Sequence, residues 1–339
     1  TAGTRHDVKG RFNGSIKADR FGGILAIGGF DVPDVEGPVD IVVNGFSGEA
    51  DDSDLRVDTM TLQGTLRGSR VDGVLKRRHG PAGGVDRLEI AGNAANGEGR
   101  ILLEQLGLSP RSDLSGAGTI SVQLNGDTGG TYDTNFRVNV GGTTLTARGK
   151  VEAPFEAIRF TGRADIAASG VMHVLGGFGA PDGLAHWVGR QAAGPGFVFS
   201  SDVVWDKQRL ALSDLEAIAG SFRLLGEAVW TEGEGETLPR LTGKLDANGI
   251  DLTPLIGSDE TAVWPADALD WSALGALDAD VDLKAGSLVL GRLSASNIST
   301  KVALSHGVLT ASPLTGDFAR GRLSIGARIE GGRGQPGAG

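Results

Sequence analysis

Apolar and polar residues alternate with a period of two along much of the chain. In the segment from Leu277 to Ala285, the Leu, Ala and Val side chains point one way and the Asp and Lys side chains the other. The same alternation occurs at residues 39–43, 120–124, 135–140, 298–304 and 322–330. These segments predict strands with one apolar and one polar face, as in an antiparallel sheet.

Turn signals separate these segments roughly every 8 to 12 residues. Asn-Gly pairs predict tight hairpin turns, and they occur at Asn44-Gly45, Asn96-Gly97, Asn125-Gly126 and Asn248-Gly249. Further turn signals are Gly129-Gly130, Gly141-Gly142, Ser305-His306-Gly307 and residues 232–235. At about 11 residues per strand and turn, we expect roughly 25 to 30 strands, more than one compact sandwich needs.

Helical periodicity is confined to three short segments, residues 170–179, 182–190 and 266–276. Pro181 and Pro265 precede the last two segments, where proline suits the first turn of a helix. The predicted fold class is therefore all-β: an elongated, curled antiparallel sheet that forms a groove, with a few short helices.

Composition narrows the possible functions. Glycine accounts for 56 of 339 residues, and a long curled sheet needs glycine at bulges and bends. The absence of cysteine excludes disulfides, thiolate nucleophiles and cysteine-ligated metals. A net charge of −10 argues against a nucleic-acid-binding protein. No apolar run is long enough to predict a transmembrane helix.

Three charged segments are candidates for a binding or catalytic site. The basic run at residues 76–79 predicts a solvated hairpin tip. The acidic run at residues 49–54 lacks the spacing of a calcium-binding EF-hand loop and predicts a solvated turn. Asp278, Asp280 and Asp282 share one strand face, and a glycosidase pair is conceivable there, but three aspartates on one polar face are ordinary polar alternation.

No motif for catalysis or metal binding is present. The histidines lack zinc-site spacing, and they are His6, His79, His173, His186 and His306. The sequence contains neither a phosphate-binding loop nor a nucleophile elbow. We therefore expect no catalytic residue, no metal and no cofactor, and a protein that is not an enzyme.

The apolar strand faces remain as the candidate site, because few helices are predicted to cover them. They can pack into a closed core, or they can line a trough for acyl chains, in which each buried CH₂ group contributes about 0.8 kcal/mol. The candidate groove-lining residues are Val281, Leu283, Ile298, Val302, Leu304, Leu323, Ile325 and Ile329.

The C-terminal half resembles the AsmA-like family of bacterial envelope proteins, which are relatives of TamB and of the bridge-like lipid-transfer proteins. The resemblance is carried by Leu241–Leu255, Trp271, Leu274–Ala285 and Leu304–Leu323. It suggests that residues 1–155 form the N-terminal part of the groove and residues 156–330 its AsmA-like C-terminal part, with a flexible tail at residues 331–339.

The resemblance implies a non-catalytic protein that moves phospholipid between the inner and outer membranes and supports outer-membrane biogenesis. The family is periplasmic and anchored in the inner membrane, so we expect the anchor to lie outside this chain. The expected partners are phospholipid acyl chains, both membranes, and envelope proteins at an edge strand; nucleic acid is not expected.

Two alternatives stay open. One is a structural assembly factor for outer-membrane proteins, with a closed, dry core and a protein partner at an edge strand. The other is a polysaccharide-acting β-solenoid enzyme, which needs a carboxylate pair and aromatic platforms for sugars. Tyr132 is the only tyrosine, and the tryptophans lie at Trp187, Trp205, Trp230, Trp264 and Trp271.

Overall fold

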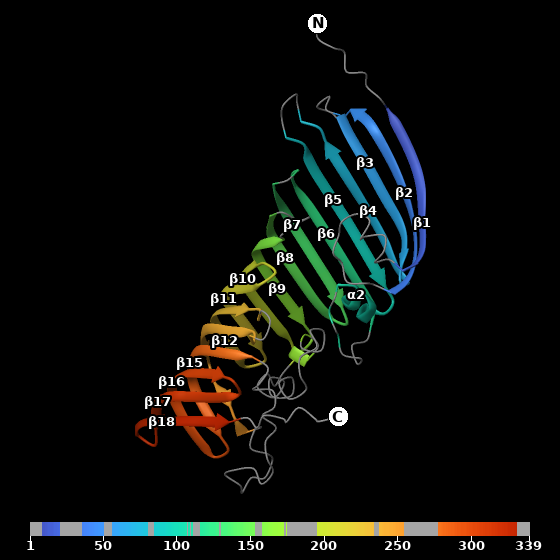
Figure 1. The fold of residues 1–339 in the computed structure, drawn as a ribbon. Helices are drawn as coiled ribbons and strands as arrows, with labels where there is room; N and C mark the ends of the chain where they lie inside the picture. Colours follow the sequence, from blue (N-terminus) through green and yellow to red (C-terminus); the bar gives the residue numbers. More distant parts are fainter. Residues whose placement is uncertain are drawn as a thin grey trace, which may run out of the picture. The chain divides into compact units, whose positions relative to one another are not determined.

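The computed structural model describes residues 9–20, 36–50, 56–80, 85–106, 108, 110, 116–128, 130–152, 158–172, 174, 195–233, 237–253 and 277–330. Within these residues the chain forms 18 strands of one open, curled sheet (Figure 1). The predicted all-β fold class is confirmed. None of the helical segments in the described ranges combines the length and apolar character needed to cross a membrane.

The chain divides into two compact units. Unit 1 comprises Thr1–Gly162 and His173–Ala180. Its elements are β1 (Gly10–Arg20), β2 (Glu36–Ala50), β3 (Arg56–Leu66), β4 (Ser69–Arg78), β5 (Arg87–Asn96), α2 (Gly99–Gln105), β6 (Gly118–Asp127), β7 (Thr131–Val140) and β8 (Thr143–Glu152).

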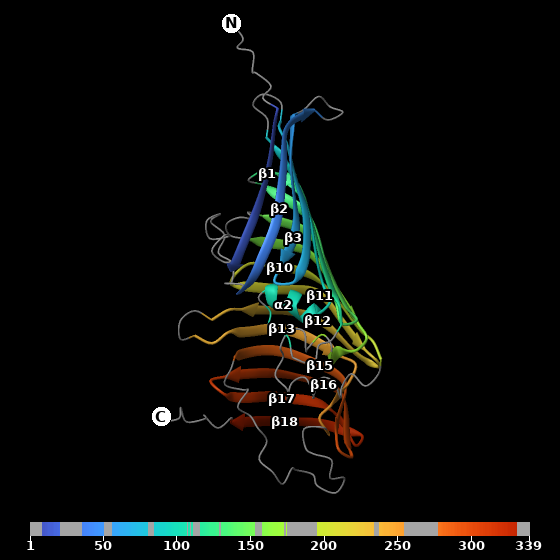
Figure 2. The same cartoon turned by 90° about the vertical axis from the view of Figure 1, so that its right-hand side faces the viewer.

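Unit 2 comprises Arg163–Met172 and Pro181–Gly339, so the boundary between the units falls within β9 (Arg159–Ala168). Its further strands are β10 (Phe197–Trp205), β11 (Arg209–Ala219), β12 (Phe222–Thr231), β13 (Arg240–Ala247), β14 (Ile250–Asp251), β15 (Asp278–Leu290), β16 (Leu293–Ser305), β17 (Val308–Phe318) and β18 (Gly321–Glu330). Figure 2 shows the bowed strands from β13 to β18 following one another.

Strand pairing is sequential and largely antiparallel. In unit 1, each strand from β1 to β8 pairs antiparallel with the next. In unit 2, β13 and β14 instead pair parallel with β15. Parallel neighbours need a crossover of a dozen or more residues, and the connection from β14 to β15 is long enough to supply one. The predicted antiparallel arrangement therefore has one parallel exception.

The segments predicted from the alternation overlap β2, β6, β7, β15, β16 and β18, but the strands are longer than expected. β2 has 15 residues and β15 has 13, so a strand and its turn exceed the expected 11 residues. The described residues hold 18 strands, whereas the prediction of 25 to 30 refers to the whole chain.

Some predicted turns are correct and others are not. Gly141-Gly142 and His306-Gly307 have positive φ at both residues, as a two-residue hairpin turn requires. Asn44-Gly45 and Asn125-Gly126 instead lie inside β2 and β6. An added Cβ at Gly45 would overlap the ring of Phe12 on β1, so this ring would have to shift.

The helices were predicted poorly. Val171 and Met172 are helical, as expected for residues 170–179, whereas the segments 182–190 and 266–276 lie outside the described residues. Helix α2 was not predicted, because its seven residues are too few to show a clear helical period. It forms through tertiary contacts: Leu103 packs against Val138 and Val140 at the end of β7.

Leu102 of α2 is fully buried, so Leu102→Ala should leave a cavity in unit 1. We expect the free energy of unfolding of this unit to fall by about 2–5 kcal/mol. Leu106→Ala, at the exposed end of the same helix, should change it by less than about 0.5 kcal/mol. Urea denaturation followed by circular dichroism measures both, and equal losses would contradict the packing described for α2.

Candidate functional site

The apolar side chains of unit 1 lie in rows across one face of its sheet. Residues that pair directly across neighbouring strands project to the same side, so the strand register defines each row. Three consecutive rows are almost entirely apolar or glycine. We call them the apolar rows: Ile16, Ile41, Gly64, Val71, Ala94, Ile120, Val138, Leu145; then Gly14, Val43, Leu62, Gly73, Gly92, Val122, Phe136, Ala147; then Phe12, Gly45, Met60, Leu75, Ile90, Leu124, Thr134, Gly149.

Most side chains of the apolar rows are only partly buried. Ile41 and Val138 are buried, whereas Leu62, Leu75 and Ile90 are intermediate in exposure. At the edge strand, 57% of Phe12 is exposed. The face therefore presents apolar surface that the described residues leave partly open.

Helix α2 covers one end of this face (Figure 1). The row beneath it, which we call the helix-side row, contains Leu66, Ser69, Asn96, Gly118 and Val140. Buried Ser69 donates to Gln105 Oε1 of α2 at 3.1 Å and accepts from Asn96 Nδ2 at 2.9 Å. These bonds hold α2 against the ends of β4 and β5.

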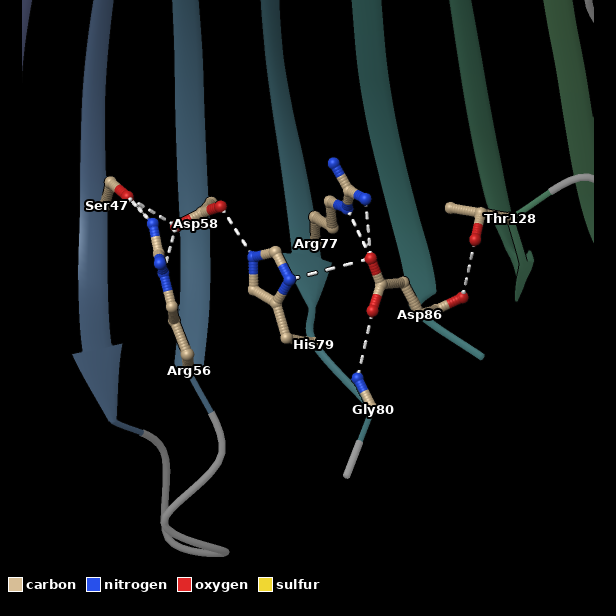
Figure 3. A network of polar contacts seen from close by, with 8 residues as sticks. All are labelled: Ser47, Arg56, Asp58, Arg77, His79, Gly80, Asp86 and Thr128. Carbon is tan, nitrogen blue, oxygen red and sulfur yellow. Dashed lines mark hydrogen bonds and ion pairs between the residues drawn. The ribbon is translucent and has the colours of Figure 1, made fainter. Parts of the chain in front are cut away.

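The opposite end of the same face carries charge. The next row beyond the apolar rows contains Ser47, Asp58 and Arg77, followed by Leu88, Gly126 and Tyr132. Arg56, His79 and Asp86 lie just beyond it (Figure 3). We call Ser47, Arg56, Asp58, Arg77, His79 and Asp86 the charged cluster.

His79 links two carboxylates in this cluster. Its Nε2 lies 2.6 Å from Asp58 Oδ2, and its Nδ1 lies 3.5 Å from Asp86 Oδ2 (Figure 3). Asp58 also accepts from Ser47 Oγ at 2.7 Å. Asp86 accepts from Arg77 Nε at 2.7 Å and from the Gly80 backbone N–H at 3.0 Å.

Both carboxyl groups are stronger acids than usual. Desolvation raises the pKa of Asp58, but hydrogen bonds from His79 and Ser47 and the charge of Arg56 outweigh it and lower the pKa from 3.8 to about 2. The Gly80 N–H and the Arg77 guanidinium lower the pKa of Asp86. Both groups are therefore ionised at neutral pH.

The basic run at residues 76–79 differs from its prediction as a solvated hairpin tip. Lys76, Arg77 and Arg78 lie within β4. Arg77 pairs with Asp86, and Arg78 Nη1 lies 3.1 Å from Glu89 Oε1. The run therefore belongs to a strand and is not a hairpin tip, although Lys76 and Arg77 are exposed as predicted.

Unit 2 has an apolar face of its own, and it contains all eight residues predicted to line a groove. The register pairs Val281 with Val302, and it aligns Ile325 with Leu314. The full set from β15, β16 and β18 is Val281, Leu283, Ile298, Val302, Leu304, Leu323, Ile325 and Ile329. Strands β10 to β13 extend the face with Phe199, Val203, Trp205, Leu210, Leu212, Leu224, Trp230, Leu241 and Leu245.

The burial of these eight residues is uneven. Ile298 is buried in a local core with Ala247, Ala285 and Ala295, and Leu323 packs against that core. Ile325, by contrast, is 48% exposed. Ile298 and Leu304 on β16 are therefore buried, whereas Ile325 on β18 is open.

The other face of each unit is mostly polar, although Val42 in unit 1 and Val198, Ile218 and Leu225 in unit 2 are exposed on it. Cross-strand ion pairs there include Lys17–Asp40 at 2.9 Å and Lys301–Asp280 at 3.0 Å. Asp280 and Asp282 also line an open cavity of about 520 Å³ on this face of unit 2, together with Glu227 and Lys244. Of the three aspartates considered for a glycosidase pair, Asp280 thus pairs with Lys301 and Asp278 accepts from the His306 backbone N–H at 3.1 Å.

Among the remaining histidines, only His306 lies within the described residues. His306 is a turn residue whose Nδ1 lies 2.8 Å from Ser305 Oγ. His6, His173 and His186 lie outside the described residues, as do residues 51–54 of the acidic run. In the described ranges, no three His, Asp or Glu side chains are grouped closely enough to hold a metal ion.

Comparison with protein-family models, curated proteins and solved structures finds no match to this chain. Fold and geometry therefore define the class: an open, curled β-sheet with an apolar face and a polar face in each unit.

The lowered pKa of Asp58 predicts a specific acid sensitivity. Ionised Asp58 stabilises the folded chain above its ordinary pKa of 3.8, and this stabilisation is lost as the pH falls towards 2. The difference in the free energy of unfolding between wild type and Asp58→Asn, measured by urea unfolding, should therefore shrink as the pH falls through this interval. Asp133→Asn, on the exposed face of β7, is the control, and a pH-independent effect of Asp58→Asn would contradict the assignment.

Proposed function

We propose that this chain binds phospholipid acyl chains on the apolar faces of its sheet and transfers phospholipid between membranes. The observation that carries the proposal is the continuity of the apolar face across the strands of each unit. A structural sheet face that needed no ligand would be expected to be covered, whereas side chains such as Phe12 and Ile325 are about half exposed.

The energetics support acyl chains as the ligand. Burying ten CH₂ groups contributes on the order of 8 kcal/mol before the cost of immobilising the lipid. This contribution is non-directional, so an apolar face needs no polar side chains to bind the tails. Partly exposed Leu, Ile, Val and Phe side chains are suited to that role.

On the resemblance to the AsmA-like family, we propose that transfer takes place in the periplasm, between the inner and outer membranes. The membrane anchor is then supplied by a segment outside this chain. The proposal applies to both units, since each carries one apolar and one polar face.

A second candidate is an assembly factor that docks a partner strand. It is favoured by β18, which pairs only with β17 in the described part of the chain and whose side chains are mostly exposed. Exposed edge strands readily accept an added strand. This candidate predicts a chain that carries no lipid.

The first experiment is to purify the chain without detergent, extract it with organic solvent and identify bound lipids by mass spectrometry. We expect phospholipid in stoichiometric amount, above that bound to a soluble control protein treated identically. A folded chain with no bound lipid would overturn the proposal and favour the assembly factor.

Substitutions on the two sides of one strand test the face itself. Ile325→Asp on β18 should abolish lipid loading of unit 2 near that edge, because it places a charge on the apolar face. Ser324→Asp puts the same charge on the opposite face and should leave loading unchanged. Val302→Asp and Ser299→Asp repeat the comparison on β16.

Circular dichroism keeps this test interpretable. Ile325 is half exposed, so its aspartate variant should retain the strand content of the wild type. If Ile325→Asp and Val302→Asp both unfold the chain, these residues belong to a closed core. If both variants stay folded and load lipid normally, the face is not the binding site.

A further inference from the structure

We propose that the charged cluster at the end of the unit 1 face binds the headgroup of a zwitterionic phospholipid, with Arg77 contacting the phosphate and Asp58 the ammonium group. This inference rests on the proposed function and names the lipid class. It concerns a polar site, which the apolar faces alone do not provide.

The position of the charges is the first argument. Elsewhere on β4, the charged residues Arg70, Asp72 and Lys76 project to the polar face. Asp58 and Arg77 instead project to the apolar face, directly after the last apolar row. Charges on this side therefore mark one end of the apolar rows.

The opposite end of the face is closed to a headgroup. Helix α2 covers the helix-side row at β5, β6 and β7, its Leu102 and Leu103 are buried, and its Gln105 bonds to Ser69 at the end of β4. Gly118 lies so close to α2 that an added Cβ would be 2.9 Å from Leu102 Cδ1. An amphiphile with its tails on the apolar rows would thus have its headgroup at the charged cluster.

The distances fit an acyl chain lying along the strands. From Arg77 to Val71 on β4 there are six residues, which span about 20 Å at 3.4 Å per residue. The tails of one bilayer leaflet span about 15 Å, half of the hydrocarbon thickness. A tail can therefore lie across the apolar rows while its headgroup reaches Arg77.

The charge pattern selects a zwitterion. Asp58 and Asp86 are ionised, and Arg56 and Arg77 balance them, so positive and negative groups alternate within the cluster. The side chain of Arg77 is 49% exposed and that of Asp58 is 30% exposed, so a ligand can reach both. An anionic headgroup has no ammonium group, so it would bring a negative charge to the two carboxylates and no cation of its own to pair with them.

The test offers the chain a choice of headgroups on identical tails. Purified chain is incubated with vesicles of equimolar phosphatidylethanolamine, phosphatidylglycerol and diacylglycerol, separated from them, and its bound lipid is quantified by mass spectrometry. We expect phosphatidylethanolamine to be enriched roughly two- to fivefold over phosphatidylglycerol, as partly exposed ion pairs support.

Two variants assign the contacts. Asp58→Asn should bring the ratio of phosphatidylethanolamine to phosphatidylglycerol down to about that of the vesicles, because the ammonium contact is lost. Arg77→Gln should remove the preference for phospholipid over diacylglycerol. Asp72→Asn and Arg70→Gln make the same changes on the polar face of β4 and should have no effect.

The outcomes separate this inference from the proposed function. A wild-type chain that carries lipid in the proportions of the vesicles would overturn the headgroup site and leave acyl-chain binding standing. Equal shifts in the polar-face controls would also overturn it. A folded chain that carries no lipid would overturn the proposed function, and the headgroup site with it.

Discussion

Cross-strand pairing in register is the constraint on which the rest of this structure depends. A shift of one residue would turn every apolar side chain of a strand to the polar face. In unit 1 the register from β3 to β8 runs without a shift, which is why single rows can be followed across six strands. The apolar rows, the helix-side row and the charged cluster all follow from this alignment.

Glycine makes the alignment possible where strands approach closely. Gly149 on β8 and Gly162 on β9 face each other, and an added Cβ on either would overlap the backbone of the other strand. Gly243 on β13 is in a similar position against the backbone of β12. The high glycine content is thus tied to strand contacts, which are also where a sheet can bend.

Charge is distributed between the faces for different physical reasons. Ion pairs on the polar face, such as Lys17–Asp40, are largely exposed and contribute little to stability. The charged cluster lies on the apolar face, where hydrogen bonds from His79 and Ser47 and the charge of Arg56 hold Asp58 in its ionised form despite its partial burial. The proposed binding of a lipid headgroup would account for charges on the apolar face, whereas a closed core would not.

The sequence by itself determined which segments are strands and which side chains share a face, because period-two alternation is a local property of the backbone. All eight residues predicted to line a groove lie on one face of β15, β16 and β18 for that reason. Tertiary structure decided the rest. Asn44-Gly45 became part of a strand because β1 and β3 pair with it on both sides, and α2 formed because its Leu103 packs against Val138 and Val140 of β7. The charged cluster joins Asp58, His79 and Asp86 only once β3, β4 and β5 pair, since the interactions between them depend on the register.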